Sequence, residues 1–260
     1  MENINLYKGD CLEVMDKLIS ENIQVDLTVT SPPYDNLRNY EDSLQWNEEI
    51  WKQVIERLYK ITKNGGVVVW VVGDATIKGS ETGTSFKQAL YFKEIGFNLH
   101  DTMIWIKDGG GAVGSNKCYT QNFEYMFVFS KGKINTTNLI YDKPNASFGK
   151  DKSGVGRRLV TGEHKIEKRK PSAEFSRRNN YWYIAPQNGE HPAVFPEALA
   201  NDHIISWSNE GDVVLDCFMG SGTTGKVAKQ LKREFIGIEK VDKYFEMSKK
   251  RINNIQPTLF

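Results

Sequence analysis

The chain has 260 residues, of which 39% are hydrophobic and 26% charged, and its formal net charge is +1. This composition is typical of a folded globular protein and excludes a largely disordered one. No apolar run approaches the ~20 residues that a membrane-spanning helix needs. The N-terminal sequence MENINLYKGD is acidic and polar, unlike a secretion signal. The chain has three cysteines and no CxxC pair. Together with the polar N-terminus, this predicts a cytoplasmic protein with reduced thiols.

Charge is unevenly distributed along the chain. Residues 131–185 contain 13 Lys or Arg and 5 Asp or Glu, whereas the rest of the chain contains 21 and 28. A basic segment beside an acidic body is typical of a protein that meets a polyanion with one part of its surface. The alternative is a solvated loop region with surplus lysine, and charge alone does not separate the two.

Short apolar runs alternate with amphipathic stretches over the first 107 residues. The helical spacing of Ile50, Val54, Leu58 and Ile61, followed by a pair of glycines, predicts a helix. The expected strands are INLYKGD, QVDLTVT, VVVWVVGD and LHDTMIWIK, and the expected helices span residues 11–20, 48–66 and 85–97. Repeated strand–helix units predict a mainly parallel sheet covered by helices.

A long polar stretch separates this region from a second compact one. FEYMFVFSKG (residues 123–132) predicts another buried strand, and residues 132–190 are then polar, basic and glycine-rich, with NNYWYI as a strand that returns to the core. The expected elements that follow are a helix after HPAVFP, the strand DVVLDCF, the helix TTGKVAKQLK, the strand EFIGIE and a last helix over residues 241–255. The basic segment is therefore predicted to be an insertion in one α/β domain.

The stretch DCFMGSGTTGKV (residues 216–227) places a glycine-rich turn between a strand and a helix. Its Gly-x4-Gly-Lys spacing is similar to a phosphate-binding P-loop, but Val227 stands where a Ser or Thr would bind Mg²⁺. Asp216 would repel a triphosphate, whereas Glu239, at the end of the next strand, suits the hydroxyls of a ribose. The set favours S-adenosylmethionine, a cationic adenosine ligand, and leaves ATP as the alternative.

A second loop, TSPPYD (residues 30–35), ends the strand VDLTV. Each proline fixes φ and lacks an N–H, and the residue before a proline is held extended, so Ser31-Pro32-Pro33 predicts a rigid bend. Outward carbonyls at such a bend could accept both hydrogens of an exocyclic amine, and Tyr34 offers an aromatic face to a planar ring. A plain turn after a strand is the alternative.

Together, TSPPY and DCFMGSGTT resemble the motifs of DNA methyltransferases that act on exocyclic amines, at cytosine N4 or adenine N6. FEYMFVFSKG resembles the strand beside the target-base pocket of this family, and HPAVFPEAL the segment that closes over the methionine end of its methyl donor. The catalytic loop precedes the donor loop, which is the order of the family's β group.

The resemblance implies a Rossmann-like three-layer α/β fold with a mainly parallel sheet. Residues 1–131 and 186–260 would form the S-adenosylmethionine-dependent catalytic domain, in permuted order, and residues 132–185 a basic target-recognition insertion. The implied partner is double-stranded DNA. A homodimer and a cognate restriction endonuclease are further expectations.

The resemblance also implies which residues form the site. The donor would be bound by Asp10, Asp216, Phe218, Gly220, Ser221, Gly222, Thr223 and Glu239. The catalytic loop would comprise Ser31, Pro32, Pro33 and Tyr34, and DNA would be contacted by Arg157, Arg158, Lys168, Arg169, Lys170, Arg177 and Arg178. Asp10 is equally compatible with a cap of the helix that follows it. His164 and His191 lack metal-ligand partners at suitable spacing, so no metal is expected.

The predicted mechanism needs no protein nucleophile, because the sulfonium already activates the methyl group. Hydrogen bonds from the target amine to Ser31 Oγ and the Pro32 carbonyl would free its lone pair, and the base would have to flip out of the duplex. Family members with Ser at the first position of this loop mostly act on cytosine N4, so Ser31 favours N4 and leaves adenine N6 as the alternative. No Pro-Cys dipeptide occurs, which argues against methylation at cytosine C5.

Other activities remain alternatives at this point. They are a DNA-binding module without catalysis, a P-loop ATPase, and methylation of RNA or of the glutamine amide of a protein.

Overall fold

The structure is a computed structural model that describes residues 3–33, 46–107, 119–150, 156–158, 160–166, 172–187 and 196–255. Contacts divide the chain into two compact units, the larger formed by Met1–Asn138 with Asn180–Phe260 and the smaller by Leu139–Asn179. In these described ranges, no helix combines the length and the apolar character needed to cross a membrane.

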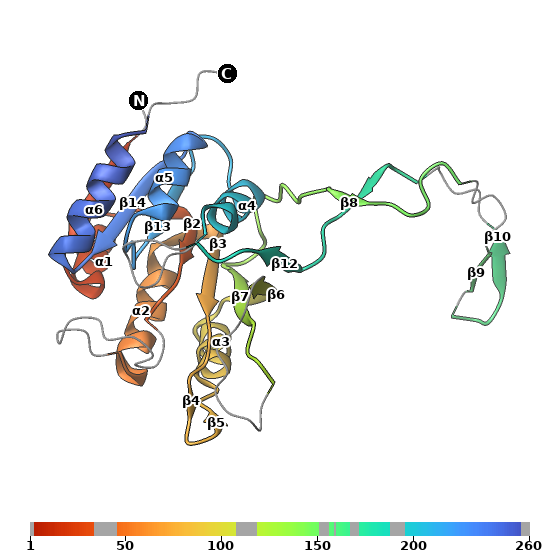
Figure 1. Cartoon of the computed structure of the whole chain (residues 1–260), viewed down its shortest axis with the longest axis horizontal. Coiled ribbons are helices and arrows are strands. Elements are labelled where there is room, and N and C mark those ends of the chain that lie inside the picture. Colours follow the sequence, from red (N-terminus) through yellow and green to blue (C-terminus); the bar gives the residue numbers. More distant parts are fainter. Residues whose placement is uncertain are drawn as a thin grey trace. The chain divides into compact units, whose positions relative to one another are not determined.

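An eight-stranded sheet with the order β1-β14-β13-β2-β3-β7-β6-β12 forms the centre of the larger unit (Figure 1). Its strands are β1 (Ile4–Lys8), β2 (Val25–Thr30), β3 (Thr62–Val72), β6 (Asn98–Lys107), β7 (Phe123–Ser130), β12 (Tyr181–Ile184), β13 (Val213–Asp216) and β14 (Glu234–Glu239). Strand β7 is antiparallel to β3 and β6, and the other neighbouring pairs are parallel. The prediction of a mainly parallel sheet is confirmed.

Helices cover the sheet in two layers. They are α1 (Cys11–Ser20), α2 (Glu48–Ile61), α3 (Thr84–Ile95), α4 (Glu197–Trp207), α5 (Thr223–Gln230) and α6 (Asp242–Asn253). Helix α2 packs against α1 and α3, whereas α5 packs against α4 and α6 (Figure 1). Two helical layers around a mainly parallel sheet confirm the expected Rossmann-like three-layer α/β fold.

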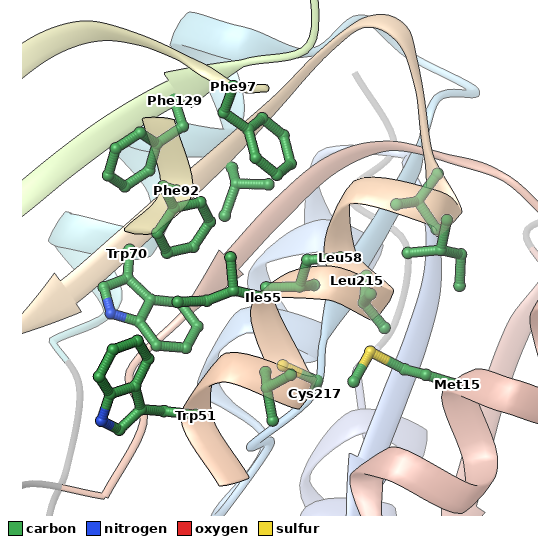
Figure 2. Packing of buried hydrophobic residues seen from close by; sticks show 14 of the residues in the cluster. Met15, Trp51, Ile55, Leu58, Trp70, Phe92, Phe97, Phe129, Leu215 and Cys217 are labelled. Atoms are coloured by element: carbon green, nitrogen blue, oxygen red, sulfur yellow. The ribbon is translucent and has the colours of Figure 1, made fainter. Parts of the chain in front are cut away.

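The core beneath α1, α2 and α3 is rich in aromatic side chains (Figure 2). Phe92 of α3 stacks on Phe129 of β7, with ring centroids 4.0 Å apart and planes 5° from parallel. Trp70 of β3 packs edge-on against Phe92 and donates its indole N–H to Gln88 Oε1 at 2.8 Å. Alternate residues of the buried strands thus supply this face of the sheet, as period-two strand geometry requires.

The boundary between α2 and β3 differs from the sequence-based expectation. The helix predicted over residues 48–66 ends at Ile61, and Thr62 already belongs to β3, where it pairs with Val25 of β2. Gly65 adopts a left-handed φ of 84° within the strand, so the glycine taken as a helix-ending signal serves an irregular strand start instead. The short hairpin of β4 (Thr76–Ile77) and β5 (Ser80–Glu81) was not expected.

NNYWYI forms the expected strand at one edge of the sheet. Strand β12 pairs in parallel with β6, and Trp182, opposite Trp105, is buried against His203 of α4. Tyr181 and Tyr183 of the same strand are exposed.

The smaller unit is built from short antiparallel pairs. Strand β8 (Lys143–Pro144) pairs with β11 (Phe175–Ser176), and β9 (Gly156–Arg158) pairs with β10 (His164–Ile166). Backbone hydrogen bonds from Arg178 to Ile140, at 2.9 Å, and from Asn145 to Glu174, at 2.8 Å, extend the first pair. This unit lies within the basic segment identified in the sequence.

We expect Phe92→Ala to lower the free energy of unfolding by about 3–5 kcal/mol, because it removes a fully buried ring and leaves a cavity. The matched control is Leu90→Ala on the same helix, where the side chain is 65% exposed and the cost should stay within about 0.5 kcal/mol. Urea denaturation measures both. Equal losses in the two variants would contradict the assignment of this core.

Candidate active site

The strands that carry the two predicted loops lie next to each other in the sheet. Leu27 and Thr28 of β2 pair with Val214 and Leu215 of β13. Because these strands are parallel, the segment that begins at Ser31 and the glycine-rich turn leave the same edge of the sheet. The ends of β1 and β14 lie along that edge too, so the predicted donor and catalytic residues that the structure describes gather on one side of the larger unit.

A buried hydrogen bond joins the two loops at their bases. Thr30, the last residue of β2, donates from Oγ1 to Asp216 Oδ1 of β13 at 2.7 Å, across 186 positions of sequence. Both residues are at least 95% buried. Asp216 also accepts hydrogen bonds from the Phe218 backbone N–H, at 3.1 Å, and from Thr224. The carboxylate therefore organises the turn that follows it and fixes the strand that leads to Ser31.

Burial raises the pKa of Asp216 to about 6, although hydrogen bonds from Thr30, Thr224 and the Phe218 backbone oppose the rise. A carboxyl group with this pKa is ionised at neutral pH and becomes neutral in mild acid. Its negative charge favours a cationic group nearby, as expected from the sequence. The same carboxylate also stabilises the turn, because it accepts hydrogen bonds from Thr30 and from the Phe218 N–H.

The glycine-rich turn is tight and packs closely against the last helix. Gly220 and Gly222 have φ values of 51° and 79°, a region that favours glycine. A Cβ on Gly222 would lie 2.8 Å from Ser248 Cβ of α6, too close for any other residue to fit without a shift. Gly222 is therefore required both by its backbone conformation and by the approach of α6.

Glu239 and Asp10 sit at the ends of the two neighbouring strands and already have backbone partners. Glu239 accepts hydrogen bonds at 2.8 Å from the N–H groups of Gly220 and Val241, one on each carboxylate oxygen. Burial raises its pKa, and these hydrogen bonds oppose the rise. Asp10 caps α1 by accepting from the Leu12 N–H at 2.9 Å, as the capping alternative expected, and its other carboxylate oxygen lies 3.2 Å from Lys240 Nζ.

An aromatic group that the motifs did not single out surrounds Phe218 of the turn. Trp46, just before α2, packs edge-on against Phe218 with ring centroids 5.4 Å apart, and the ring centroid of Trp70 lies 6.4 Å from that of Phe218. The buried indole N–H of Trp46 has no hydrogen-bond partner among the described residues. Trp46 lies only twelve residues after Tyr34 of the catalytic loop, but its partner Phe218 is far away in the sequence, so no local spacing indicates their contact.

The lysine of the P-loop-like spacing is engaged elsewhere. Lys226 Nζ contacts both carboxylate oxygens of Glu197, the first residue of α4, at 2.7 and 2.8 Å. Arg251 of α6 contacts Glu197 as well, at 2.7 Å. Lys226 therefore serves an ion-pair cluster between α4, α5 and α6, and this does not favour the ATP alternative. Neither Glu197 nor Arg251 was predicted from the sequence.

The predicted DNA-contacting residues are only partly described. Lys168, Arg169 and Lys170 lie outside the described residues, as does Tyr34 of the catalytic loop; for Arg157 and Arg158 only the backbone is described.

The remaining two, Arg177 and Arg178, lie next to each other after β11. Arg178 forms an ion pair with Asp142 and holds the pKa of that carboxyl below its usual value. Arg177 lies over the ring of Tyr141, 6.0 Å from its centroid.

Two other kinds of reactive group, clusters of metal ligands and reactive thiols, are absent from the part of the chain that the structure describes. Its His, Cys, Asp and Glu side chains form no group of three or more that could hold a metal ion. Cys11 and Cys217 are free, and burial raises the pKa of Cys11 to about 12 and that of Cys217 well above its ordinary value. Both thiols are therefore protonated and poorly nucleophilic at neutral pH.

Comparison with known proteins identifies relatives over nearly the whole chain. An orphan methyltransferase, M.BamHII of Bacillus amyloliquefaciens, is 51% identical over 253 residues that cover 91% of this chain and 92% of the relative. Among solved structures, the M1.HpyAVI–SAM complex matches with a TM-score of 0.66 and 24% identity, covering 95% of this chain and 99% of that one.

The PvuII DNA methyltransferase, titled cytosine-N4-specific, matches with a TM-score of 0.69 and 23% identity, covering 98% of this chain and 89% of the other. At these identities the two solved structures support the fold. The family model for N6- and N4-methylating enzymes, described as DNA methylase, matches residues 25–250. The chain therefore belongs to the DNA methylase family whose members methylate exocyclic amines of bases.

Proposed function

We propose that this DNA methyltransferase transfers the methyl group of S-adenosylmethionine to the N4 amine of a cytosine flipped out of double-stranded DNA. The observation that carries the proposal is the buried hydrogen bond between Thr30 and Asp216, since it joins a loop suited to a base amine to a turn suited to the donor. Ser31 at the first position of the catalytic loop supports N4 over N6. The family model covers both reactions, so adenine N6 is the second candidate.

The residues at the donor end fit S-adenosylmethionine. Gly220 and Gly222 allow the backbone to approach a ligand closely, and Asp216 supplies a negative charge beneath the turn. Glu239 lies at the end of β14 and accepts backbone N–H groups on both carboxylate oxygens, and its remaining acceptor capacity suits a ribose hydroxyl. When bound, the donor supplies a methyl group activated by its sulfonium. Asp10, Phe218, Ser221 and Thr223 complete the proposed donor site.

The acceptor end has to hold an amine and weaken its conjugation with the ring. We assign this to Ser31 Oγ and the Pro32 carbonyl, which would accept the two amine hydrogens and favour a more tetrahedral nitrogen. Pro32 and Pro33 make the bend stiff, so these acceptors need little reorganisation. Tyr34 would stack on the flipped base and recover part of the cost of extracting it, about a few kcal/mol.

The basic segment is the proposed DNA-contacting part of the chain. Its surplus of Lys and Arg suits phosphate contacts, which set affinity and register but carry no sequence information by themselves. Arg178 already has a carboxylate partner in Asp142, so we assign it mainly to the cohesion of the smaller unit. Residues 157, 158, 168, 169, 170 and 177 remain the proposed contacts. A homodimer and a cognate restriction endonuclease stay predictions, and the methyl transfer requires neither.

The base and the recognition sequence can be identified together. Expression of the chain in a host that lacks these marks, followed by sequencing that distinguishes N4-methylcytosine from N6-methyladenine, should show N4-methylcytosine at one short motif. Ser31→Ala should bind the donor normally but lose methylation by about a hundredfold or more, because it removes a contact to the reacting amine. Detection of N6-methyladenine instead would mean that adenine N6 is the target. A chain that binds DNA but leaves it unmethylated would support the alternative of a DNA-binding module without catalysis.

Donor affinity should depend on pH through Asp216. A cationic donor favours the ionised carboxylate, so binding should weaken as the pH falls through about 6 and Asp216 takes up a proton. Titration calorimetry between about pH 7.5 and about pH 5 measures this, and Asp216→Asn should bind weakly at every pH without the slope. The control is Glu239→Gln, since the pKa of Glu239 is raised too. A pH dependence that persists in Asp216→Asn and vanishes in Glu239→Gln would contradict this prediction and assign the titration to Glu239 instead.

Neutralising Lys168, Arg169 and Lys170 to Gln should weaken DNA binding uniformly across sequences. The slope of log affinity against log salt should become shallower by about 0.9 for each phosphate that the variant no longer neutralises. The matched control is Lys249→Gln with Lys250→Gln on exposed positions of α6. An unchanged slope in the triple variant, measured by fluorescence anisotropy, would mean that this cluster is only a solvated surface.

A further inference from the structure

Arg251 of α6 contacts both the glycine-rich turn and α4 through the two terminal nitrogens of its guanidinium group. Its Nη1 lies 3.0 Å from Thr223 Oγ1, 3.1 Å from Ser221 Oγ and 3.4 Å from the Ser221 carbonyl oxygen. Its Nη2 lies 2.7 Å from Glu197 Oε1. The side chain therefore contacts the residues on both sides of Gly222, where the turn enters α5.

The guanidinium group fixes the direction of these hydrogen bonds. Arginine only donates, so the hydroxyl oxygens of Ser221 and Thr223 must accept from it, and each hydroxyl proton has to point elsewhere. Both side chains belong to residues more than nine-tenths buried, at 8% and 3% exposure. Within the part of the chain that the structure describes, neither hydroxyl donates to an acceptor. Two buried hydroxyl donors are thus held at the turn with no acceptor among the described residues.

The position of Arg251 is itself strongly constrained. Glu197 accepts from Lys226 as well, and although burial acts to raise its pKa, the hydrogen bonds from Lys226 and Arg251 outweigh this and keep the pKa below its ordinary value. Glu197 is therefore ionised near neutral pH and anchors one arm of the guanidinium. Ser248 lies three residues before Arg251 on α6, and it approaches Gly222 so closely that a Cβ there would not fit. Helix α6 therefore packs directly against the turn.

The start of α5 is correspondingly rich in donors. Its N-cap is Gly222, which offers no side-chain cap, and its first turn contains no acidic residue. The leading N–H groups of a helix and the positive end of its dipole favour an anion, and here two hydroxyl donors flank them. The anionic group of S-adenosylmethionine is the carboxylate of its methionine part.

We propose that Arg251 is a positioning residue for the methyl donor. By accepting from Arg251, Ser221 and Thr223 are forced to donate, and their hydroxyls bind the carboxylate of the donor. The role rests on the proposed use of S-adenosylmethionine by this site. In this role Arg251 acts through Ser221 and Thr223, so its loss should weaken donor binding more than it lowers the rate of methyl transfer at saturating donor.

The test compares S-adenosylmethionine with its decarboxylated form, which keeps the sulfonium and the adenosine but lacks the carboxylate. In calorimetry, Arg251→Met should bind S-adenosylmethionine about tenfold more weakly than the wild type and bind the decarboxylated form within about twofold of it. Thr223→Val, which keeps the shape of the side chain but removes the hydroxyl, should show the same selectivity. Lys250→Met, an exposed neighbour on α6, should change neither affinity.

The outcomes separate this role from a merely structural one and from the proposed function. Equal weakening of both ligands in Arg251→Met and in Thr223→Val would mean that these side chains only support the fold of the turn, and would overturn the role. Unchanged binding of S-adenosylmethionine in both variants would overturn it too. A wild-type chain that binds neither ligand would instead contradict the proposed use of this donor.

Discussion

The arrangement of the site depends on one buried carboxylate. Asp216 is almost fully buried, and a charge in such a place is tolerated only when hydrogen bonds replace the water it has lost. Those bonds come from the end of β2, from the backbone of the glycine-rich turn and from the start of α5. They can form together only when β2 and β13 are neighbours and the turn is folded, so the requirement that stabilises the edge of the sheet also assembles the two loops.

The last helix belongs to the site as much as to the fold. Helix α6 excludes a side chain at Gly222 through Ser248, and its Arg251 links the turn to Glu197 at the start of α4. Glu197 directly follows Pro196, within the segment that resembles the family's closure over the donor. Ion pairs and hydrogen bonds among α4, α5 and α6 therefore hold the glycine-rich turn in place from two sides.

Local patterns predicted the parts of the fold that local physics decides. The apolar run VVVWVVGD is typical of a buried strand because both faces of a central strand are covered, and β3 forms there. The start of β3 was missed because its glycines are also typical of a helix end, and only the pairing of Thr62 with Val25 decides between them. Arg251, Glu197 and Trp46 were missed for a related reason. Their contacts join segments distant in sequence, and no spacing within one segment encodes such a contact.

The order of the two loops along the chain is immaterial to the site, because a parallel sheet gathers the carboxyl ends of its strands at one edge whatever their order in sequence. This arrangement therefore allows the smaller unit, Leu139–Asn179, to be inserted between β7 and β12. The residues that flank this unit hydrogen-bond within the larger unit: Asn138 to the end of α4 and Asn180 to the backbone of Thr102 in β6. The smaller unit is held together by backbone hydrogen bonds between its own strands. The backbone pairs that hold the smaller unit together are thus separate from the hydrogen bonds that organise Asp216 and the two loops.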